Sequence, residues 1–103
     1  MAPAIVAWTL PARQDLLKTI HYLVEQSPAS AERLLNRLEA AAASLAEFPN
    51  RGRIVPELEL PRRELIVAGY RLVYRVRGEE IQILRVIHGK QDFLKTWKEG
   101  VQQ

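Results

Sequence analysis

Two β-rich runs in the second half of the chain constrain its fold most. They cover residues 70–76 and 81–87, and a polar Arg-Gly-Glu-Glu turn separates them. This pattern predicts an antiparallel hairpin. Arginines occur in both runs, although a charged side chain is costly to place in a central strand. We therefore expect one face of the sheet to be a surface that binds a negatively charged partner.

The alternation of side chains along the first run assigns its two faces. Tyr70, Leu72, Tyr74 and Val76 share one face, and the other face carries Val73 with the arginines Arg71, Arg75 and Arg77. We expect helices to cover the apolar face and the arginine face to be uncovered. The second run is partly apolar on both faces, so the orientation of Arg85 stays open.

The N-terminal half predicts a strand followed by two helices. Residues 5–8 are β-rich, and Thr9 can cap the helix that follows. Ser27-Pro28 ends this helix and begins another, which stops at Phe48-Pro49-Asn50. Because almost no loop joins them, the two helices should form an antiparallel hairpin whose apolar faces pack on the sheet.

The remaining segments complete an α+β fold in one domain, residues 1–103. Residues 49–63 are irregular, residues 64–67 form a strand, and residues 92–98 form a short terminal helix. We expect the order β-α-α-β-β-β, with an antiparallel αα-hairpin packed on a small antiparallel β-sheet and a short C-terminal helix. The N-terminal strand should join the edge of this sheet.

Charge and composition limit the function classes. Residues 1–50 hold four basic and five acidic side chains, whereas residues 51–103 hold eleven basic and seven acidic ones. This asymmetry favours a polyanion or an acidic protein as partner, although a basic solvated surface would look the same. The chain has no cysteine and no apolar run near the roughly 20 residues that cross a bilayer. We expect a cytoplasmic protein without a membrane partner or a secretion signal.

Several short motifs, weak singly, follow one another at specific spacing over nearly the whole chain. They are Asp15-Leu16, Ile20 and Tyr22-Leu23 in the first helix, Phe48-Pro49, Gly52-Arg53 and Val55-Pro56-Glu57 after the second, and Arg63-Glu64, Tyr70–Tyr74 and His88–Gln91 in the sheet region. This pattern resembles the RelE/ParE superfamily of type II toxins. The resemblance implies an antitoxin partner that wraps around the toxin through an extended, partly disordered segment.

The superfamily resemblance leaves three functions to weigh. RelE-like members are similar to ribosome-dependent endoribonucleases that cut mRNA, whereas ParE-like members lack the nuclease and are associated with DNA gyrase. A degenerate toxin that only binds an antitoxin is the third. A nuclease needs an acid/base pair and clustered cations. Its candidate residues here are His88, Arg71, Arg75 and Arg85, with Glu57 or Glu64 as a possible base that lacks a partner fixed by spacing.

Two departures from the nuclease pattern favour the ParE-like reading, a gyrase inhibitor that is not an enzyme. No tyrosine follows Tyr74, and the His88-Gly89-Lys90-Gln91 corner looks more like the ParE branch. We expect the target-binding residues to be Arg62, Arg63, Arg71, Arg75, His88, Lys90 and Gln91. Phe93 and Trp97 on the terminal helix are the candidates for antitoxin binding, because removing this helix would bare an apolar groove.

Each candidate also has a structural interpretation. His88 can cap a strand end or pack beneath the terminal helix, His21 fits a surface position, and the tyrosines of the apolar face fit a core. Arg62 and Arg63 can be solvated or belong to the positive patch. Two histidines without a third ligand do not make a metal site, so we expect no metal and no cofactor. The antitoxin segment should be acidic, to complement the basic half.

Overall fold

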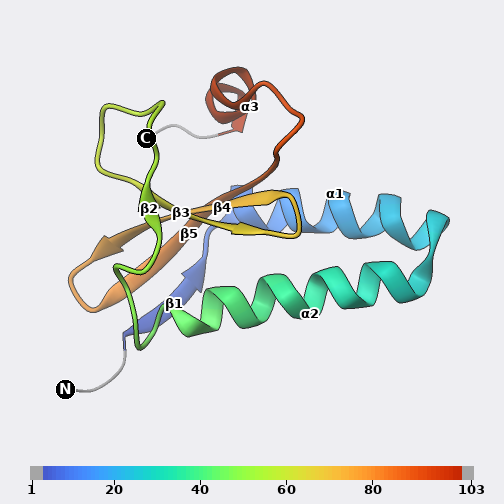
Figure 1. Ribbon diagram of the computed structural model, residues 1–103, viewed down its shortest axis with the longest axis horizontal. Helices are drawn as coiled ribbons and strands as arrows, with labels where there is room; N and C mark the ends of the chain where they lie inside the picture. The colour runs from blue at the N-terminus through green and yellow to red at the C-terminus, as the bar shows by residue number, and fades with distance from the viewer. Residues whose placement is uncertain (1–3, 101–103) are drawn as a thin grey trace.

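The computed structural model describes residues 4–100 (Figure 1). Its elements are β1 (Ile5–Trp8), α1 (Leu10–Gln26), α2 (Pro28–Ser44), β2 (Arg53–Ile54), β3 (Arg63–Val67), β4 (Tyr70–Arg77), β5 (Glu80–His88) and α3 (Phe93–Gly100). The α1–α2 hairpin lies on one side of the sheet and α3 on the other. The predicted α+β class and order of elements are confirmed. Within the described residues no helix is both long and apolar enough to span a membrane.

The sheet differs from the prediction in two respects. Its strand order is β1-β5-β4-β3-β2, and β1 pairs with β5 in parallel, so the sheet is mixed rather than antiparallel throughout. The second difference is β2, which lies within the segment predicted to be irregular and pairs with β3. Two residues are too few to show a periodicity, which is why β2 was not predicted.

Side-chain caps fix the starts of the helices at the positions that the sequence predicts. The Thr9 side chain accepts a hydrogen bond from the Ala12 N–H, and the Ser27 side chain accepts one from Ser30. Proline stands in the first turn of both helices, where its missing N–H leaves no hydrogen bond unmade. Asp92 caps α3 by accepting from the Lys95 N–H. The second helix ends at Ser44, earlier than predicted, and a turn carries the chain on to Phe48.

The larger core lies between the hairpin and the sheet. Leu34, Leu38 and Leu45 of the α2 region pack there with Leu72 and Tyr74 of β4. Burial of these side chains supplies most of the drive for folding, at about 25 cal/mol for each Å² of apolar surface removed from water. The face assigned to the tyrosines and Leu72 is therefore the one that the hairpin covers, as predicted.

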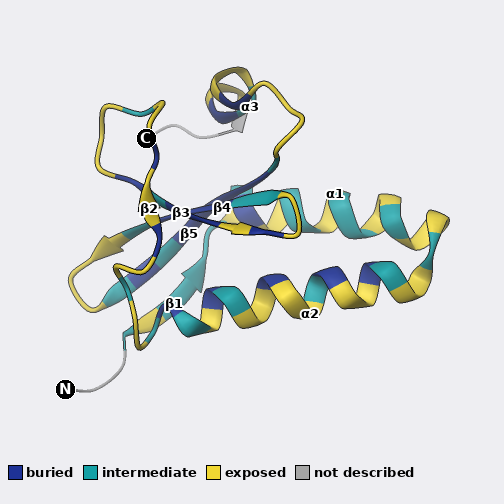
Figure 2. Ribbon diagram, in the orientation of Figure 1, coloured by how far each residue is buried: buried dark blue, intermediate teal, exposed yellow. Residues whose placement is uncertain are grey.

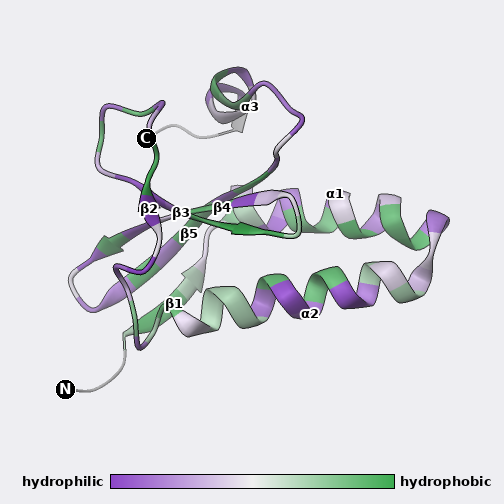
Figure 3. Cartoon of the chain, in the orientation of Figure 1, coloured by the Kyte–Doolittle hydropathy of each residue, from purple (hydrophilic) through white to green (hydrophobic). Residues whose placement is uncertain are grey.

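A second, smaller core covers part of the opposite face. Val55, Val73, Leu84, Ile87, Phe93 and Trp97 are buried together, with Leu58 packed against them. In Figure 2 dark blue segments occur in the strands and on the side of α3 that faces them, and Figure 3 shows hydrophobic segments at the same places. The expectation that the arginine face is uncovered is therefore wrong for the half of it beneath α3.

The close approach of the chain at Gly52 joins the loop after α2 to β4. The Tyr74 hydroxyl accepts a hydrogen bond from the Gly52 N–H at 3.0 Å and donates one to the Pro49 carbonyl at 2.8 Å. A Cβ at Gly52 would come within 2.7 Å of the Glu64 carbonyl oxygen, so only glycine fits there. Burial raises the pKa of the Tyr74 phenol, which keeps it protonated as a donor.

We predict that Tyr74→Phe destabilises the protein by about 1–3 kcal/mol, because the buried Gly52 N–H and the partly buried Pro49 carbonyl both lose their hydrogen bond. Urea unfolding followed by circular dichroism measures the loss. Tyr22→Phe, at an exposed helical tyrosine, is the matched control and should change the free energy of unfolding by less than about 0.5 kcal/mol. Equal effects of the two substitutions would contradict the assigned role of the hydroxyl.

Candidate functional site

The arginine face beneath α3 contains a buried carboxylate that joins two strands. Glu64 on β3 is 1% exposed and lies between two guanidinium groups. Its Oε1 accepts from Arg71 Nε at 2.6 Å, and its Oε2 accepts from Arg53 Nε at 2.7 Å. A buried carboxylate needs such partners, because an unpaired charge in the interior is strongly destabilising.

The remaining donors of Arg71 bind a second carboxylate. Nη1 and Nη2 donate to the two oxygens of Glu57 at 2.8 and 2.6 Å, a bidentate geometry typical of strong arginine–carboxylate pairs. The hydrogen bonds with Glu57 raise the pKa of Arg71, and the same bonds lower the pKa of Glu57. With its side chain only 13% exposed, Arg71 has no free charge to offer an outside anion.

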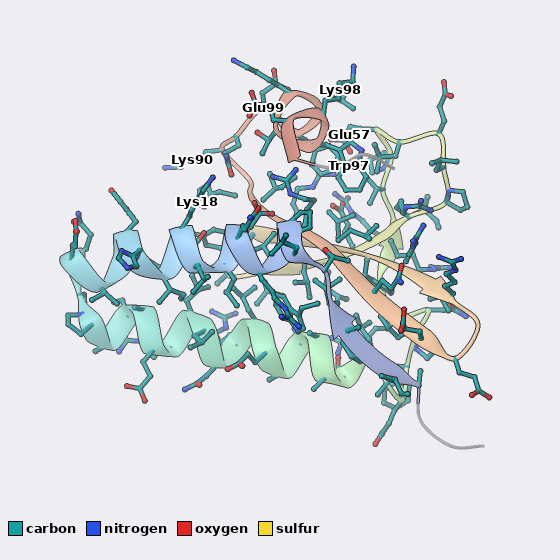
Figure 4. The ribbon with its side chains drawn as sticks, turned by 180° about the vertical axis from the view of Figure 1, so that it is seen from behind. Lys18, Glu57, Lys90, Trp97, Lys98 and Glu99 are labelled. Atoms are coloured by element: carbon teal, nitrogen blue, oxygen red, sulfur yellow. The ribbon has the colours of Figure 1, made fainter. Side chains whose placement is uncertain are left out.

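Arg71 also supports α3 directly. Its guanidinium carbon lies 3.8 Å from the centre of the Phe93 ring, a cation–π contact. Phe93 in turn stacks on Trp97, with 5.9 Å between ring centres and 17° between planes. In Figure 4 Trp97 and Glu57 lie in the space between α3 and the sheet, whereas Lys98 and Glu99 belong to the outer side of the helix. The arginine thus anchors the terminal helix.

Arg85 on β5 provides the other attachment of α3. Its Nη1 donates to the backbone carbonyls of Thr96 and Trp97, at 2.8 and 3.3 Å. Its Nε and Nη2 donate to Asp15 on α1, which also accepts from the Val86 N–H. Arg85 therefore joins α1, β5 and the middle of α3.

A bulge in the sheet orients Arg85, which the sequence left open. Val73 pairs with Arg85 but Tyr74 pairs with Ile83, so Leu84 is an extra residue on β5. A bulge of this kind turns the strand locally and redirects its side chains. Leu84 and Ile83 consequently enter opposite cores, and Arg85 is 5% exposed.

The His88 corner lies apart from these arginines. His88 pairs with Tyr70 and packs edge-on against its ring at 4.8 Å, on the face that the hairpin covers. Its ring Nδ1 accepts from the Lys90 backbone N–H at 3.0 Å, and the His88 backbone N–H donates to Gln91 Oε1. Gly89 donates to the Gly69 carbonyl at 2.8 Å. The corner is therefore a well-connected turn, with Lys90 and Gln91 exposed.

The predicted target-binding residues do not form one surface. Arg75 is about five strand residues from the His88 end of β4, roughly 17 Å, and it lies on the other face. Arg62 is buried beside Arg75, and Arg63 donates to the carbonyls of Asn50 and Gly52. The predicted nuclease set is likewise divided between the two faces. Among residues 4–100, no three His, Asp or Glu side chains are placed to hold a metal ion.

The acidic partners of the arginines were not predicted as such. Glu57, Glu64 and Asp15 lie 14, 7 and 70 residues from the arginines that they bind. The cross-strand position of Glu64 could have been found by pairing residues 64–67 with 70–73 across the two-residue turn. The other two contacts depend on how the loop and α1 fold over the sheet, which no local pattern encodes.

A hairpin of helices on one face of a small mixed sheet, with an arginine-rich second face beneath a terminal helix, is the architecture of RelE/ParE-type toxins. The comparisons with known proteins agree. A family model described as "ParE toxin of type II toxin-antitoxin system, parDE" matches residues 6–93. The chain belongs to this family, and it is the toxin component of a type II toxin–antitoxin system.

Curated relatives carry both names of the superfamily. Toxin RelE2 of Caulobacter vibrioides is 40% identical over 86 residues, which are 82% of this chain and 94% of the relative. Toxin ParE3 of the same organism is 31% identical over 85 residues, 82% of this chain and 85% of the relative. The sequence relatives therefore establish a toxin without separating the two branches.

Solved structures give the same result. The chromosomal ParDE system from P. aeruginosa contains a chain that matches with a TM-score of 0.68 and 30% identity, over 82% of this chain and 95% of that one. The RelBE2 toxin–antitoxin complex from Mycobacterium tuberculosis contains one that matches with a TM-score of 0.59 and 30% identity, over 84% and 98%. Both structures are toxin–antitoxin systems, which supports an antitoxin as partner of this chain.

We predict that Glu57 makes the stability depend on pH. Its folded-state pKa lies below the ordinary value of 4.5, so its contribution is complete above about pH 4.5 and is lost as pH falls through the folded-state pKa. Because Glu57 is largely exposed, the contribution should be only about 0.5–1 kcal/mol. Urea unfolding at pH 7 and pH 3 measures it.

The wild type should lose more stability between these two pH values than Glu57→Gln, in which the titrating group is absent. Glu59→Gln, two residues along in the same exposed loop, should behave as the wild type does. If Glu57→Gln and the wild type lost equal stability, the ion pair with Arg71 would not stabilise the folded chain.

We predict that Arg85→Gln loosens α3, because the helix loses a charged donor to the Thr96 and Trp97 carbonyls and Asp15 loses its partner. The expected cost is about 3 kcal/mol. Hydrogen exchange measured by mass spectrometry should show that the substitution speeds exchange of the α3 amides, relative to the wild type, more than exchange of the α2 amides. The exposed Arg37→Gln on α2 is the control. Unchanged exchange of α3 in the Arg85 variant would contradict this attachment.

Proposed function

We propose that this toxin is ParE-like: it inhibits DNA gyrase by binding and does not cut RNA. The observation that carries the proposal is the state of its arginines. Arg71 is bound by two carboxylates and Arg85 by a third, so neither guanidinium is free to stabilise a pentacoordinate phosphate. An enzyme that cleaves RNA needs such cations directed at the reacting phosphate.

The position of the candidate acid or base also favours a binder over a nuclease. His88, the candidate acid or base, packs against Tyr70 on the hairpin side of the sheet, whereas Arg71 and Arg75 lie on the α3 side. General acid–base catalysis requires the proton donor within hydrogen-bond reach of the reacting atoms. One phosphate could not contact His88 and these arginines together. The geometry therefore supports a binder over a nuclease.

The surface that we propose for gyrase is the His88–Gln91 corner with the outer side of α3. Four backbone and side-chain hydrogen bonds hold this corner, so Lys90 projects from a turn that is already ordered. A preordered turn loses little conformational entropy on binding. Arg63 and Arg75, the half-buried candidates, lie too far away to belong to the same contact.

A RelE-like endoribonuclease is the second candidate, because the relatives at 40% and 38% identity are named Toxin RelE2 and Toxin RelE1. This reading needs Arg71 to be released from Glu57, on the loop between β2 and β3, and from Glu64 on β3. A translating extract supplied with the toxin distinguishes the two candidates, since only the nuclease yields mRNA cut at the ribosomal A site. A degenerate antitoxin-binding module, the third possibility, would leave growth intact when it is expressed alone.

We also propose that the antitoxin engages the small core beneath α3. Phe93 and Trp97 cover Val55, Val73, Leu84 and Ile87, so a displaced α3 would expose an apolar groove. An amphipathic antitoxin segment could occupy such a groove with its own apolar side chains. The antitoxin would then act on the same helix whose outer side we assign to gyrase.

We predict that Lys90→Ala raises the toxin concentration that half-inhibits gyrase supercoiling by about tenfold, equivalent to about 1.4 kcal/mol. Arg37→Ala, an exposed charge on α2 outside the proposed surface, is the matched control and should change it less than twofold. Wild-type toxin without any effect on purified gyrase, combined with A-site cleavage of mRNA, would overturn the proposed function. An equal effect of both substitutions would overturn only the surface.

A further inference from the structure

Two arginines at the other end of the sheet face each other and have no acidic partner among the described residues. Arg63 pairs with Tyr74, so the register places Arg62 opposite Arg75, on the face away from the hairpin. Arg62 is 8% exposed. Its Nη1 donates to the Pro61 carbonyl at 3.2 Å, and its Nε has no hydrogen-bond partner within the described residues.

This arrangement is costly to the folded chain. The four ion pairs of residues 4–100 use Arg53, Arg71 and Arg85, and none reaches Arg62 or Arg75. Burial, and secondarily the charge of Arg75, lowers the pKa of Arg62. Like charges directly opposite each other on paired strands are destabilising, and a buried donor without an acceptor adds to the cost.

Gln82 on β5 orients the second guanidinium. Its side-chain oxygen accepts from Arg75 Nε, and its amide nitrogen donates to Glu80. The Arg75 side chain is therefore held from the β5 side by a neutral group, which leaves its two Nη groups available. These two groups are donors for an oxyanion, and the buried charge of Arg62 nearby adds to the positive potential there.

We propose that the Arg62–Arg75 pair binds a carboxylate from an acidic segment of the antitoxin. The proposal rests on the toxin–antitoxin assignment, but not on gyrase as the target. A single Asp or Glu side chain would supply the missing negative charge and relieve the repulsion between the two guanidiniums. The basic end of the toxin would then be neutralised only in the complex.

The surroundings of Arg75 favour a polypeptide over a nucleic acid. Arg75 borders a surface hollow of about 200 Å³ that is also lined by Ile54, Pro61, Arg63, Val76 and Asn50. Ile54 and Val76 are 52% and 42% exposed, an apolar rim that a phosphate backbone would not cover. A segment in which an acidic residue lies close to an apolar one matches both the Arg75 guanidinium and this rim.

The test uses the antitoxin encoded in the adjacent reading frame and isothermal titration of the full-length toxin. Arg75→Gln should weaken binding by about 10- to 100-fold, the range that corresponds to losing a charge-assisted hydrogen bond. Arg77→Gln, an exposed arginine on the same face two residues along, is the matched control and should weaken binding less than threefold. If Arg75→Gln has no larger effect than Arg77→Gln, the proposed site is wrong.

Two further measurements separate the alternatives. Arg62→Met removes the buried charge and keeps most of the volume, so the free variant should melt about 4 °C above the wild type while binding antitoxin more weakly. A melting temperature below that of the wild type would show a structural role and contradict the proposal. A 20-base-pair DNA duplex is the second probe. Loss of its binding in Arg75→Gln with unchanged antitoxin affinity would assign the pair to nucleic acid and overturn the proposal.

Because binding of the antitoxin is the readout, the result does not depend on supercoiling inhibition. A toxin inactive on gyrase can still show the difference between Arg75→Gln and Arg77→Gln. Conversely, the site can fail while gyrase inhibition is confirmed. The two proposals therefore fail by different observations.

Discussion

The contact on which the rest of this structure depends is Arg71 between Glu57, Glu64 and Phe93. One guanidinium satisfies a buried carboxylate, fixes the loop that carries Glu57 and supports the first turn of α3. Pairing makes the burial of Glu64 tolerable, and the packing of Phe93 and Trp97 keeps water from the pair. The terminal helix is thus held by charge as much as by apolar contact.

The pairing of Arg71 also divides the arginines of this face into two groups. Arg71 and Arg85 are neutralised by carboxylates inside the protein, whereas Arg62 and Arg75 have no acidic partner in the part of the chain that the structure describes. The arginine face therefore has two ends with opposite character. One end attaches α3, and the positive charge of the other end is unbalanced within residues 4–100.

Local patterns were sufficient for much of the fold. The caps at Thr9 and Ser27, and the alternation of Tyr70 to Arg77, follow from short-range chemistry that is visible in the sequence. The parallel pairing of β1, the bulge at Leu84 and the cover over Arg71 arise from contacts between distant segments. The site was accordingly predicted in residue type but not in arrangement, since the carboxylates that neutralise its arginines approach from a loop and from α1.

The measurement that tests the central claim most directly is nuclear magnetic resonance of the arginine side chains in the free toxin. A guanidinium held by carboxylates exchanges its Nε–H with solvent slowly and rotates slowly. We predict sharp, protected Nε–H resonances for Arg71 and Arg85, and a rapidly exchanging one for the exposed Arg77. Rapid exchange at Arg71 equal to that at Arg77 would show that Glu57 and Glu64 do not hold its guanidinium.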